Sequence, residues 1–501
     1  MPRFTARVLA LLCSFAAIAA LRAQDLPAAP PATTPLTLEE CIARALRKNF
    51  DLQIQGYSTD IARESLEIAK ADFDPTLTAS VNRNLSQAAT ATSSLDGTVR
   101  EGQRNDSTSA SIGVNQRIPQ TGAVVGLSTG VTRGATNSSN ALLNPNYGNT
   151  VTATISQPLL KNFGPKVGKA NVERNKLGLG IATLNYKSRV LTVVRDTENA
   201  YNNLVSARET LRIRQLSLEL AQRLLDENTA RRSSGVATDL DVLTAEVGVA
   251  NSRRAAIQAE QTVRNAEDSL LGLFTPENFD LRPGVVTFAP YNEPAPSFPV
   301  SYKRALDNQP DYYSALATVK QLEIDLSVAK QNRLPALNLD GRLGYSANDR
   351  SYYDVIAAIP NRHGNNWSIG LSYTMPWRMK ADTARYRSTF ASLNSQKARL
   401  AQFEQSLLIQ VRTAIRSVET NIASVDIAAK ATELSAKQYE LQKARFDAGL
   451  STSRLVLQAQ DDLEIARLAE LSAKVTLRAA VAELHRLEGT SLKRFNINLP
   501  E

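Results

Sequence analysis

A long internal repeat limits the folds that this chain can adopt. Residues 41–81 align without a gap to residues 301–341 at a shift of 260, and residues 230–246 align to residues 444–460 at a shift of 214. Only two copies exist, and each is too long to be one unit of a solenoid. We therefore expect two structurally equivalent halves with the same order of elements. Because the shift falls from 260 to 214, the first half carries 46 additional residues between the two matching blocks.

The beginning of the chain has the pattern of a secretory signal. Arg3 and Arg7 precede an apolar run over 8–21, and Ala23 is a small residue suited to cleavage. Removal of this signal would leave one cysteine, Cys41, so no internal disulfide can form. Without the three arginines of the signal, the formal charge falls from +9 to +6. The remaining charges are interspersed, which indicates a solvated helical surface and argues against nucleic acid as a partner.

Composition and hydropathy divide the rest of the chain into segments. No segment after the signal has about 18 continuous apolar residues, which excludes ordinary transmembrane helices. The order that we expect in each half is helix, strands, long helix, tight turn, helix. The predicted segments are a signal peptide (1–23), a Pro/Ala-rich linker (24–35), a first repeat (36–274, with a helix 36–73, strands within 75–158, a long helix 160–231 and a helix 238–274), an inter-repeat linker (275–298), a second repeat (299–489, with a helix 299–333, strands within 335–377, a long helix 380–447 and a helix 452–488) and a C-terminal tail (490–501).

The strand segments alternate between apolar and polar residues. Lysine is absent from 75–158, where Ser, Thr, Asn and Gly dominate, and 367–377 alternates strictly over eleven residues. Such strands either belong to a half-buried soluble sheet or cross a membrane, with apolar side chains towards lipid and polar ones towards a wet lumen. The export signal and the strand length favour the membrane alternative. Trp367, Tyr373 and Trp377 are then candidate anchors at the membrane interface.

The helical segments are unusually long. Residues 168–231 and 380–447 contain no proline, so each could form a helix of about 95–100 Å. Leucine recurs every seven residues in both segments, as in Leu204, Leu211 and Leu218. Helices of this length occur mainly in coiled coils and helical repeats. We expect each to pack against the shorter helix that follows it across a glycine-containing turn.

The residues give little support to an enzyme. The two histidines, His363 in a polar loop and His485 on a helix, lack neighbours typical of a metal site or a catalytic triad. We find no glycine motif for phosphate binding. We therefore expect no catalytic activity, no metal and no cofactor.

Together these features resemble the TolC family of outer-membrane efflux proteins over residues 36–489. The residues that carry the resemblance are LTLEECIARALRKNFDLQIQ and its echo YKRALDNQPDYYSAL, the junctions AKADFDPTL and AKQNRLPAL, and the turns RRSSGVATDLDVLTAE and RFDAGLSTSRLVLQAQ. The resemblance implies an α+β membrane protein in the outer membrane with a periplasmic extension. It implies a homotrimer whose strands share one barrel in outer-membrane lipid and whose antiparallel helices form a coiled-coil tunnel. It also implies two partners, a periplasmic adaptor and an inner-membrane transporter.

One part of the chain departs from the family pattern of two strands per half. The first half offers four candidate strands, because the runs 108–118 and 123–133 lie between the outer pair. This additional hairpin either lies outside the lipid or enlarges the barrel, and we favour two membrane strands per half. Six strands are too few to close a barrel alone, so strands that enter lipid require other copies of the chain.

The resemblance places a periplasmic gate at the two glycine-containing turns. Asp241 stands six residues after Gly235, where the family carries an acidic residue at the tip, and Asp239 lies beside it. In the second turn, after Gly449, Leu455 occupies the matching position, so an acidic ring would come from the first half only. The residues singled out for the gate and for adaptor contact are Asp239, Asp241 and Arg454, and Gly235, Thr238, Gly449 and Thr452.

The same gate residues also have structural explanations. Thr238 and Asp241 have the spacing of a capping box, and Asp239 suits the positive end of a helix dipole. Gly235 and Gly449 are suited to the left-handed conformation at a helix C-terminus. Arg454 could pair with Asp239 or Asp241 on a neighbouring helix. Pore lining and capping therefore both remain open for Asp241.

We expect the protein to act as a passive exit duct in a tripartite efflux pump or a type I secretion system. The alternative is an envelope coiled-coil scaffold or adhesin without transport activity. The duplicated strand segments disfavour this alternative, because a scaffold of helices does not need them.

Overall fold

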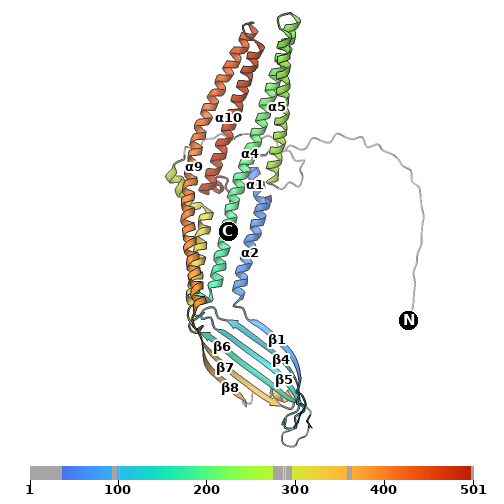
Figure 1. The fold of residues 1–501 in the computed structure, drawn as a ribbon, viewed down its shortest axis with the longest axis vertical. Coiled ribbons are helices and arrows are strands. Elements are labelled where there is room, and N and C mark those ends of the chain that lie inside the picture. Colours follow the sequence, from blue (N-terminus) through green and yellow to red (C-terminus); the bar gives the residue numbers. More distant parts are fainter. Residues whose placement is uncertain are drawn as a thin grey trace, which may run out of the picture.

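The computed structural model describes most of the chain. The expected signal peptide and Pro/Ala-rich linker, most of the inter-repeat linker, the end of the tail and His363 lie outside the described residues. Those residues are 36–92, 99–100, 102–274, 286, 288, 296–357 and 364–497. Within them the molecule is elongated, with helical hairpins at one end and an antiparallel sheet at the other (Figure 1).

The described elements occur in the same order in both halves. Two short helices lead into strands, and a long helix then leads back to a tight turn and a shorter helix. The helices of the first half are α1 (Leu38–Lys48), α2 (Phe50–Ala71), α3 (Pro165–Gly168), α4 (Ala170–Ser233) and α5 (Asp239–Gly272). Those of the second half are α6 (Phe298–Asn308), α7 (Pro310–Gln331), α8 (Tyr352–Ala357), α9 (Lys380–Asp447), α10 (Ser453–Glu488) and α11 (Ser491–Arg494). None of the helices that the structure describes combines the length and apolarity needed to span a membrane.

The first predicted helix is divided in two. At Asn49 the backbone is extended (φ −68°, ψ 127°), and its side-chain oxygen accepts hydrogen bonds from the backbone N–H groups of Asp51 and Leu52. Asn49 therefore caps α2 instead of continuing α1, because its short amide side chain satisfies the free donors of a new helix. In the second half Pro310 begins α7 at the corresponding point.

The long helix of the first half begins later than the sequence predicts. Residues 160–164 form a turn in which Asn162 and Gly164 have positive φ angles of 65° and 92°. Pro165 then begins the short helix α3, and α4 starts at Ala170. The helices α4 and α9 contain 64 and 68 residues. At 1.5 Å per residue they extend over about 95–100 Å.

Six strands form one antiparallel sheet with the order β1-β4-β5-β6-β7-β8. The strands are β1 (Thr76–Gln87), β4 (Arg104–Arg117), β5 (Val124–Thr136), β6 (Asn146–Pro158), β7 (Ala336–Asp349) and β8 (Asn365–Thr374); β2 (Ala91–Thr92) and β3 (Val99–Arg100) pair separately. The preference for two membrane strands in each half stays a prediction, because the strand order alone does not show which strands enter lipid. In the first half the sheet holds more than the outer pair, since β4 and β5 lie between β1 and β6. They are held there by continuous pairing on both sides.

The strand register gives the sheet one apolar face and one polar face. Cross-strand neighbours share a face, and the pairs Leu77↔Val114 and Leu127↔Ala153 lie on the apolar one. This face is exposed, since its larger side chains have 40 to 77% of their surface accessible. Those side chains are Leu77, Val81, Leu85, Ile112, Val114, Leu127, Ile155, Leu339, Leu343, Trp367, Ile369, Leu371 and Tyr373. The opposite face carries mainly Ser, Thr, Asn and Gly.

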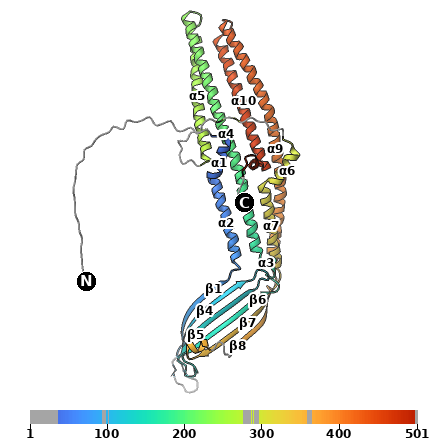
Figure 2. The ribbon, with the colours of Figure 1, turned by 180° about the vertical axis from the view of Figure 1, so that it is seen from behind.

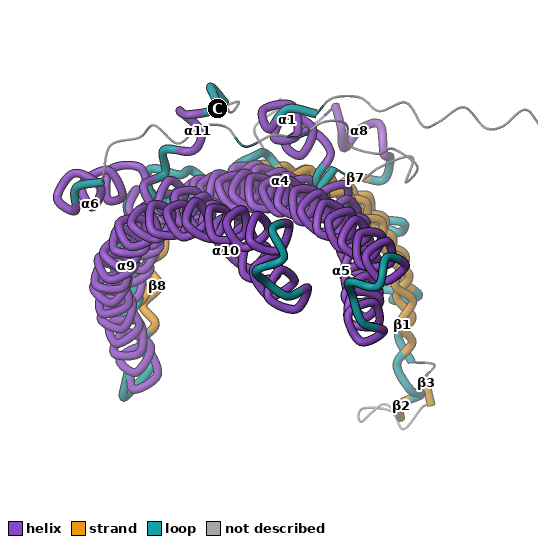
Figure 3. Tube along the Cα trace, turned by 90° about the horizontal axis from the view of Figure 1, so that it is seen from above, coloured by secondary structure: helices purple, strands orange, loops and turns teal. Residues whose placement is uncertain are grey.

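The buried core lies in the helices. The larger cluster joins α1 and α2 to α4 and α5, and includes Ile42, Val190, Leu204 and Leu270. A second cluster joins α6 and α9 to α10 around Val411 and Val418. Viewed from behind, α6 and α7 lie beside α9 (Figure 2). Viewed from above, the long helices follow an arc, and the turn between α9 and α10 lies on its concave side (Figure 3).

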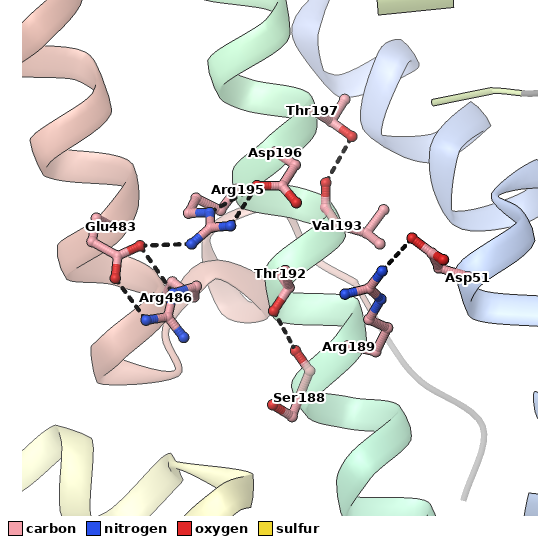
Figure 4. Close-up of polar contacts among 10 residues, drawn as sticks. All are labelled: Asp51, Ser188, Arg189, Thr192, Val193, Arg195, Asp196, Thr197, Glu483 and Arg486. Carbon is pink, nitrogen blue, oxygen red and sulfur yellow. Dashed lines mark hydrogen bonds and ion pairs between the residues drawn. The ribbon is translucent and has the colours of Figure 1, made fainter. Parts of the chain in front are cut away.

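Ion pairs connect α4 to helices of both halves (Figure 4). Arg195 of α4 donates to Glu483 of α10 at 3.1 Å, and Arg189 of α4 pairs with Asp51 of α2. Burial alone would raise the pKa of Glu483, but the hydrogen bonds and charges of Arg486 and Arg195 outweigh it and hold that pKa below its ordinary value. The carboxylate therefore stays ionised, and α4 connects helices from both halves.

Candidate gate at the helix-hairpin tips

Both long helices end in the same glycine-containing turn. Gly235 and Gly449 have φ angles of +79° and +76°, in the left-handed region. After α4, the N–H of Val236 donates to the carbonyl of Arg231 at 2.9 Å. After α9, the N–H of Leu450 donates to the carbonyl of Arg445 at 2.8 Å. These are Schellman motifs, in which glycine adopts the positive φ without steric strain. The two glycines thus close each helix and reverse the chain.

The first turn continues into a capping box. Thr238 Oγ1 accepts a hydrogen bond from the N–H of Asp241 at 3.3 Å, and Asp241 Oδ2 accepts one from the N–H of Thr238 at 3.0 Å. The Thr238 hydroxyl also donates to the same carboxylate oxygen at 2.6 Å. These hydrogen bonds, first from the side chain and then from the backbone of Thr238, lower the pKa of Asp241. Asp241 is therefore an ionised capping residue, and its carboxylate remains at the surface of the tip.

The other predicted gate residues do not come together within one chain. Arg232 pairs with Asp239 at 2.5 Å, which joins the end of α4 to the beginning of α5. Arg454 is exposed on the first turn of α10, and the carboxylates of Asp239 and Asp241 have the partners just described instead. Thr452 is the N-cap residue of α10, but its side chain makes no capping hydrogen bond. The pairing of Arg454 with either aspartate is therefore not present inside the protomer.

Arg231 connects the two tips to each other. Its guanidinium lies 4.1 Å from the centre of the Phe446 ring and donates to the Phe446 carbonyl at 3.2 Å. The same group pairs with Glu227 at 2.8 Å. Phe446 is buried and packs with Leu224 and Val456 in a small cluster between the hairpins. A cation over an aromatic face in such a setting contributes about 0.5–2 kcal/mol.

Three polar contacts between α4 and α10 extend this connection, and the sequence reasoning missed them. The hydroxyl of Ser453 donates to Asn228 Oδ1 at 2.8 Å, and Gln460 Nε2 donates to the carbonyl of Ser217 at 2.8 Å; both contacts are buried. Arg214 also pairs with Glu464, whose side chain is 10% exposed. The sequence could have indicated these contacts, because polar residues occupy positions that the helical period assigns to the core.

Near its tip, α10 also carries two adjacent acidic residues, Asp461 and Asp462. They were not among the residues singled out from the sequence. Partial desolvation, followed by the neighbouring carboxylate of Asp462, raises the pKa of Asp461, while Arg214 opposes this change. The tip of this hairpin lies on the concave side of the arc (Figure 3). Acidic groups near the tip are therefore present in the second half as well as the first.

The predicted aromatic anchors lie at different places. Trp367 and Tyr373 belong to the apolar face of β8, where they are 74 and 61% exposed. They are six positions apart, which corresponds to about 20 Å along a strand. Trp377 lies beyond the end of β8 and is 96% exposed. Among the described residues, no cluster of three or more His, Cys, Asp or Glu side chains is arranged to hold a metal ion.

Comparison with known proteins identifies the family. The family described as "Outer membrane efflux protein" matches residues 124–274 and 301–490, which is more than half of the chain. The pyoverdine export outer membrane protein OpmQ of Pseudomonas aeruginosa is 26% identical over 310 residues, which cover 58% of this chain and 61% of that protein. The chain thus spans about three fifths of the length of this curated relative.

Solved structures share the fold. The CmeC outer membrane channel of Campylobacter jejuni superposes with a TM-score of 0.66 at 18% identity, covering 91% of this chain and 86% of CmeC. The open state of the MtrE outer membrane channel of Neisseria gonorrhoeae gives 0.64 at 20% identity, covering 91 and 90%. VceC, an outer membrane protein of Vibrio cholerae, gives 0.67 at 15% identity, covering 90 and 96%. The chain is therefore a protein of the outer membrane and belongs to the outer membrane efflux protein family, as its resemblance to the TolC family predicts.

Proposed function

We propose that three copies of this chain form a channel through the outer membrane, continued by a helical tunnel into the periplasm. The observation that carries this proposal is the open six-stranded sheet with one exposed apolar face. A sheet inside a membrane must close into a barrel, because lipid cannot satisfy the free N–H and C=O groups of its edges. One chain has too few strands to close, so β1 and β8 need partners from other copies.

The helical layer has a complementary feature at its edge. The helix α2 exposes an apolar stripe at helical spacing, in which Phe50, Ile54, Tyr57, Ile61 and Ile68 are 60 to 69% accessible. The helix α9 lies at the other edge of the layer (Figure 1). It exposes Phe390 and Ile409. An exposed stripe of this length suits contact with another helix. Packing of α2 on one copy against the opposite edge of the next would surround a central space.

In this arrangement the hairpin tips form the gate. The contacts of Arg231, Ser453 and Gln460 hold the hairpin α9/α10 against α4 and favour a closed tip. Asp241 of the first half, together with Asp461 and Asp462 of the second, supplies negative charge close to the opening. Converging carboxylates would favour cations over anions. The pore-lining role of Asp241 and Asp239, and any pairing of Arg454 across copies, belongs to this proposal.

In this proposal the channel is a passive path, and its partners drive transport. We propose that a periplasmic adaptor contacts the turns around Gly235, Thr238, Gly449 and Thr452, and that an inner-membrane transporter supplies the cargo. OpmQ is named for pyoverdine export. That name supports efflux of small molecules over type I secretion of proteins.

Planar-bilayer recordings of the purified protein test this function. We expect small, cation-selective channels, and we expect Asp241→Asn to reduce cation selectivity while leaving oligomer assembly intact. Thr262→Ala on α5, whose hydroxyl bonds only to its own helix, is the matched control. Unchanged cation selectivity in Asp241→Asn would show that this residue does not line the pore. A well-folded protein that never inserts into lipid would favour the envelope scaffold.

A further inference from the structure

We infer that the hairpin β4–β5 crosses the membrane as part of the barrel wall, so that three copies build a barrel of eighteen strands with a wide lumen. This inference rests on the proposed trimer and adds what the trimer alone does not specify. Six strands from each of three copies give eighteen. Barrels of about 16–18 strands enclose an open aqueous channel.

The apolar face of the sheet continues across the hairpin. Ala110 and Ile112 of β4 pair with Val81 and Ala79 of β1, which lie on the same face. Further along the sheet, Leu127 of β5 pairs with Ala153 of β6. The hairpin therefore presents the same apolar face as its neighbours, at the same height. A hairpin lying outside lipid would interrupt this face in its middle and would leave β1 separated from β6.

The strands of the hairpin are as long as the neighbouring strands of the sheet. β4 and β5 contain 14 and 13 residues, while β1 and β6 contain 12 and 13. A tilted strand needs about 9–11 residues to cross the hydrocarbon core. At the end of the band furthest from the helices, Arg83 pairs with Asp106 at 2.9 Å on this face, and Arg133 of β5 lies opposite Thr108 at the same level. Charged residues thus appear on β1 and β4 at the same level, as expected where both leave the lipid.

The turn of the hairpin is packed at the helical end of the sheet. Residues 118–123 connect β4 to β5 at the helical end of the sheet, without continuing into a helix. The Thr121 carbonyl accepts a hydrogen bond from Gln157 Nε2 at 3.1 Å. Gly122 (φ +78°) lies so close to Asn162 that an added Cβ would be 2.5 Å from its carbonyl oxygen. The turn is therefore packed against the segment between β6 and α3, which fixes the hairpin in the wall.

The polar face of the hairpin would line the additional part of the lumen. From Asn105 to Asn115 on β4, and along β5, this face carries Ser, Thr, Asn, Gly and one Val, while Arg117 lies at the helical end. The hairpin therefore widens the lumen without adding charge inside the membrane band. On β7 the same face carries Asp340 and Arg342, whose opposite charges balance. Charge discrimination then belongs mainly to the helical tips, and the barrel acts as a wide outlet for bulky hydrophilic cargo.

Paired cysteine variants test the position of the hairpin. The variants are made in a Cys41→Ala background and placed in lipid vesicles. Ser111→Cys should react with a membrane-impermeant maleimide at least about tenfold faster than Ile112→Cys. The reason is that a thiol facing lipid is kept from water and from ionising. Ser368→Cys and Ile369→Cys, on the two faces of β8, provide the matched control pair. If the β8 pair differs while both β4 variants react at the same rate, the hairpin lies outside the lipid and the inference fails. If the β8 pair also shows no difference, the proposed barrel itself fails.

A deletion provides a second, independent measurement. Residues 88–146 are removed, and an Asn-Gly turn joins Gln87 to Tyr147, so that β1 can pair directly with β6 while the apolar residues of both strands stay on one face. Since barrel diameter scales with strand number, the largest polymer that enters from the outer side should shrink by about one third in diameter. Cation selectivity should stay the same. A folded, conducting trimer with an unchanged polymer limit would overturn the inference.

Discussion

The sheet and the helical hairpins use apolar residues in opposite ways. The helices bury theirs in clusters around Leu204 and Val411, which are almost fully covered. The strands expose theirs, so that Leu343 and Ile369 remain 64 and 72% accessible. A protein that depended on its own core alone would bury both sets. The difference indicates that the helical part is largely stabilised within one chain, and it supports the proposal that lipid and further strands complete the sheet.

The largest effect should come from charging the apolar face of the sheet. We expect Leu343→Lys on β7 to destabilise the folded, membrane-inserted form by about 2–4 kcal/mol, because a lysine near the middle of the bilayer must leave water. The fraction of heat-modifiable oligomer on unheated gels measures this loss. Asn338→Lys, on the polar face of the same strand, should retain most of the oligomer. Equal losses in both variants would contradict the assignment of the two faces.

The next largest effect should come from the apolar stripe on α2, which belongs to a helix but exposes its apolar side chains as the sheet does. Ile61→Asp should weaken assembly by about 1.5–3 kcal/mol per chain, the free energy of burying an aliphatic side chain of this size. Size-exclusion chromatography with mass detection would then show dissociated chains. Glu67→Gln lies off the stripe and should assemble normally. Full assembly of Ile61→Asp would show that this stripe is not an interface.

A smaller effect is expected inside the helical part. Ser453→Ala removes the partner of the buried Asn228 side-chain oxygen, and an unsatisfied buried group costs about 1–3 kcal/mol. The closed tip should be destabilised by this amount, which would appear as a larger open fraction in bilayer recordings. Thr476→Ala on α10, whose hydroxyl bonds only to its own helix, should leave gating unchanged. A lower melting temperature without any change in conductance would make the contact purely structural.

The smallest effect concerns pH at the first tip. Because the folded pKa of Asp241 lies below the ordinary value of 3.8, its capping contribution is present above that value and is lost as pH falls through the lowered pKa. As the pH falls from neutral to below 3.8, thermal unfolding should reveal a larger loss of helix stability in the natural chain than in Asp241→Asn. Thr238→Ala should cost about 0.5–2 kcal/mol at neutral pH. Parallel pH profiles for the natural chain and Asp241→Asn would contradict the capping geometry.

Residue patterns predicted much of this molecule. The internal repeat anticipated the order of elements, and the glycines of both turns lie in the predicted left-handed conformation. The break at Asn49 was missed because its capping role depends on a local conformation that helical periodicity does not reveal. The place of β4 and β5 inside the sheet could not be read from the sequence, because alternation identifies strands but not their neighbours. The contact of Ser453 with Asn228 joins residues 225 positions apart, a separation at which sequence spacing carries no information.

The mass of the lipid-inserted particle tests the central claim most directly. Single-particle mass measurement in lipid nanodiscs would count the chains that complete each sheet. The account predicts three copies of the chain in one inserted particle, with conductance in the same preparation. An inserted single chain, or a folded protein found only outside the lipid, would contradict it, because neither could close the edges of β1 and β8.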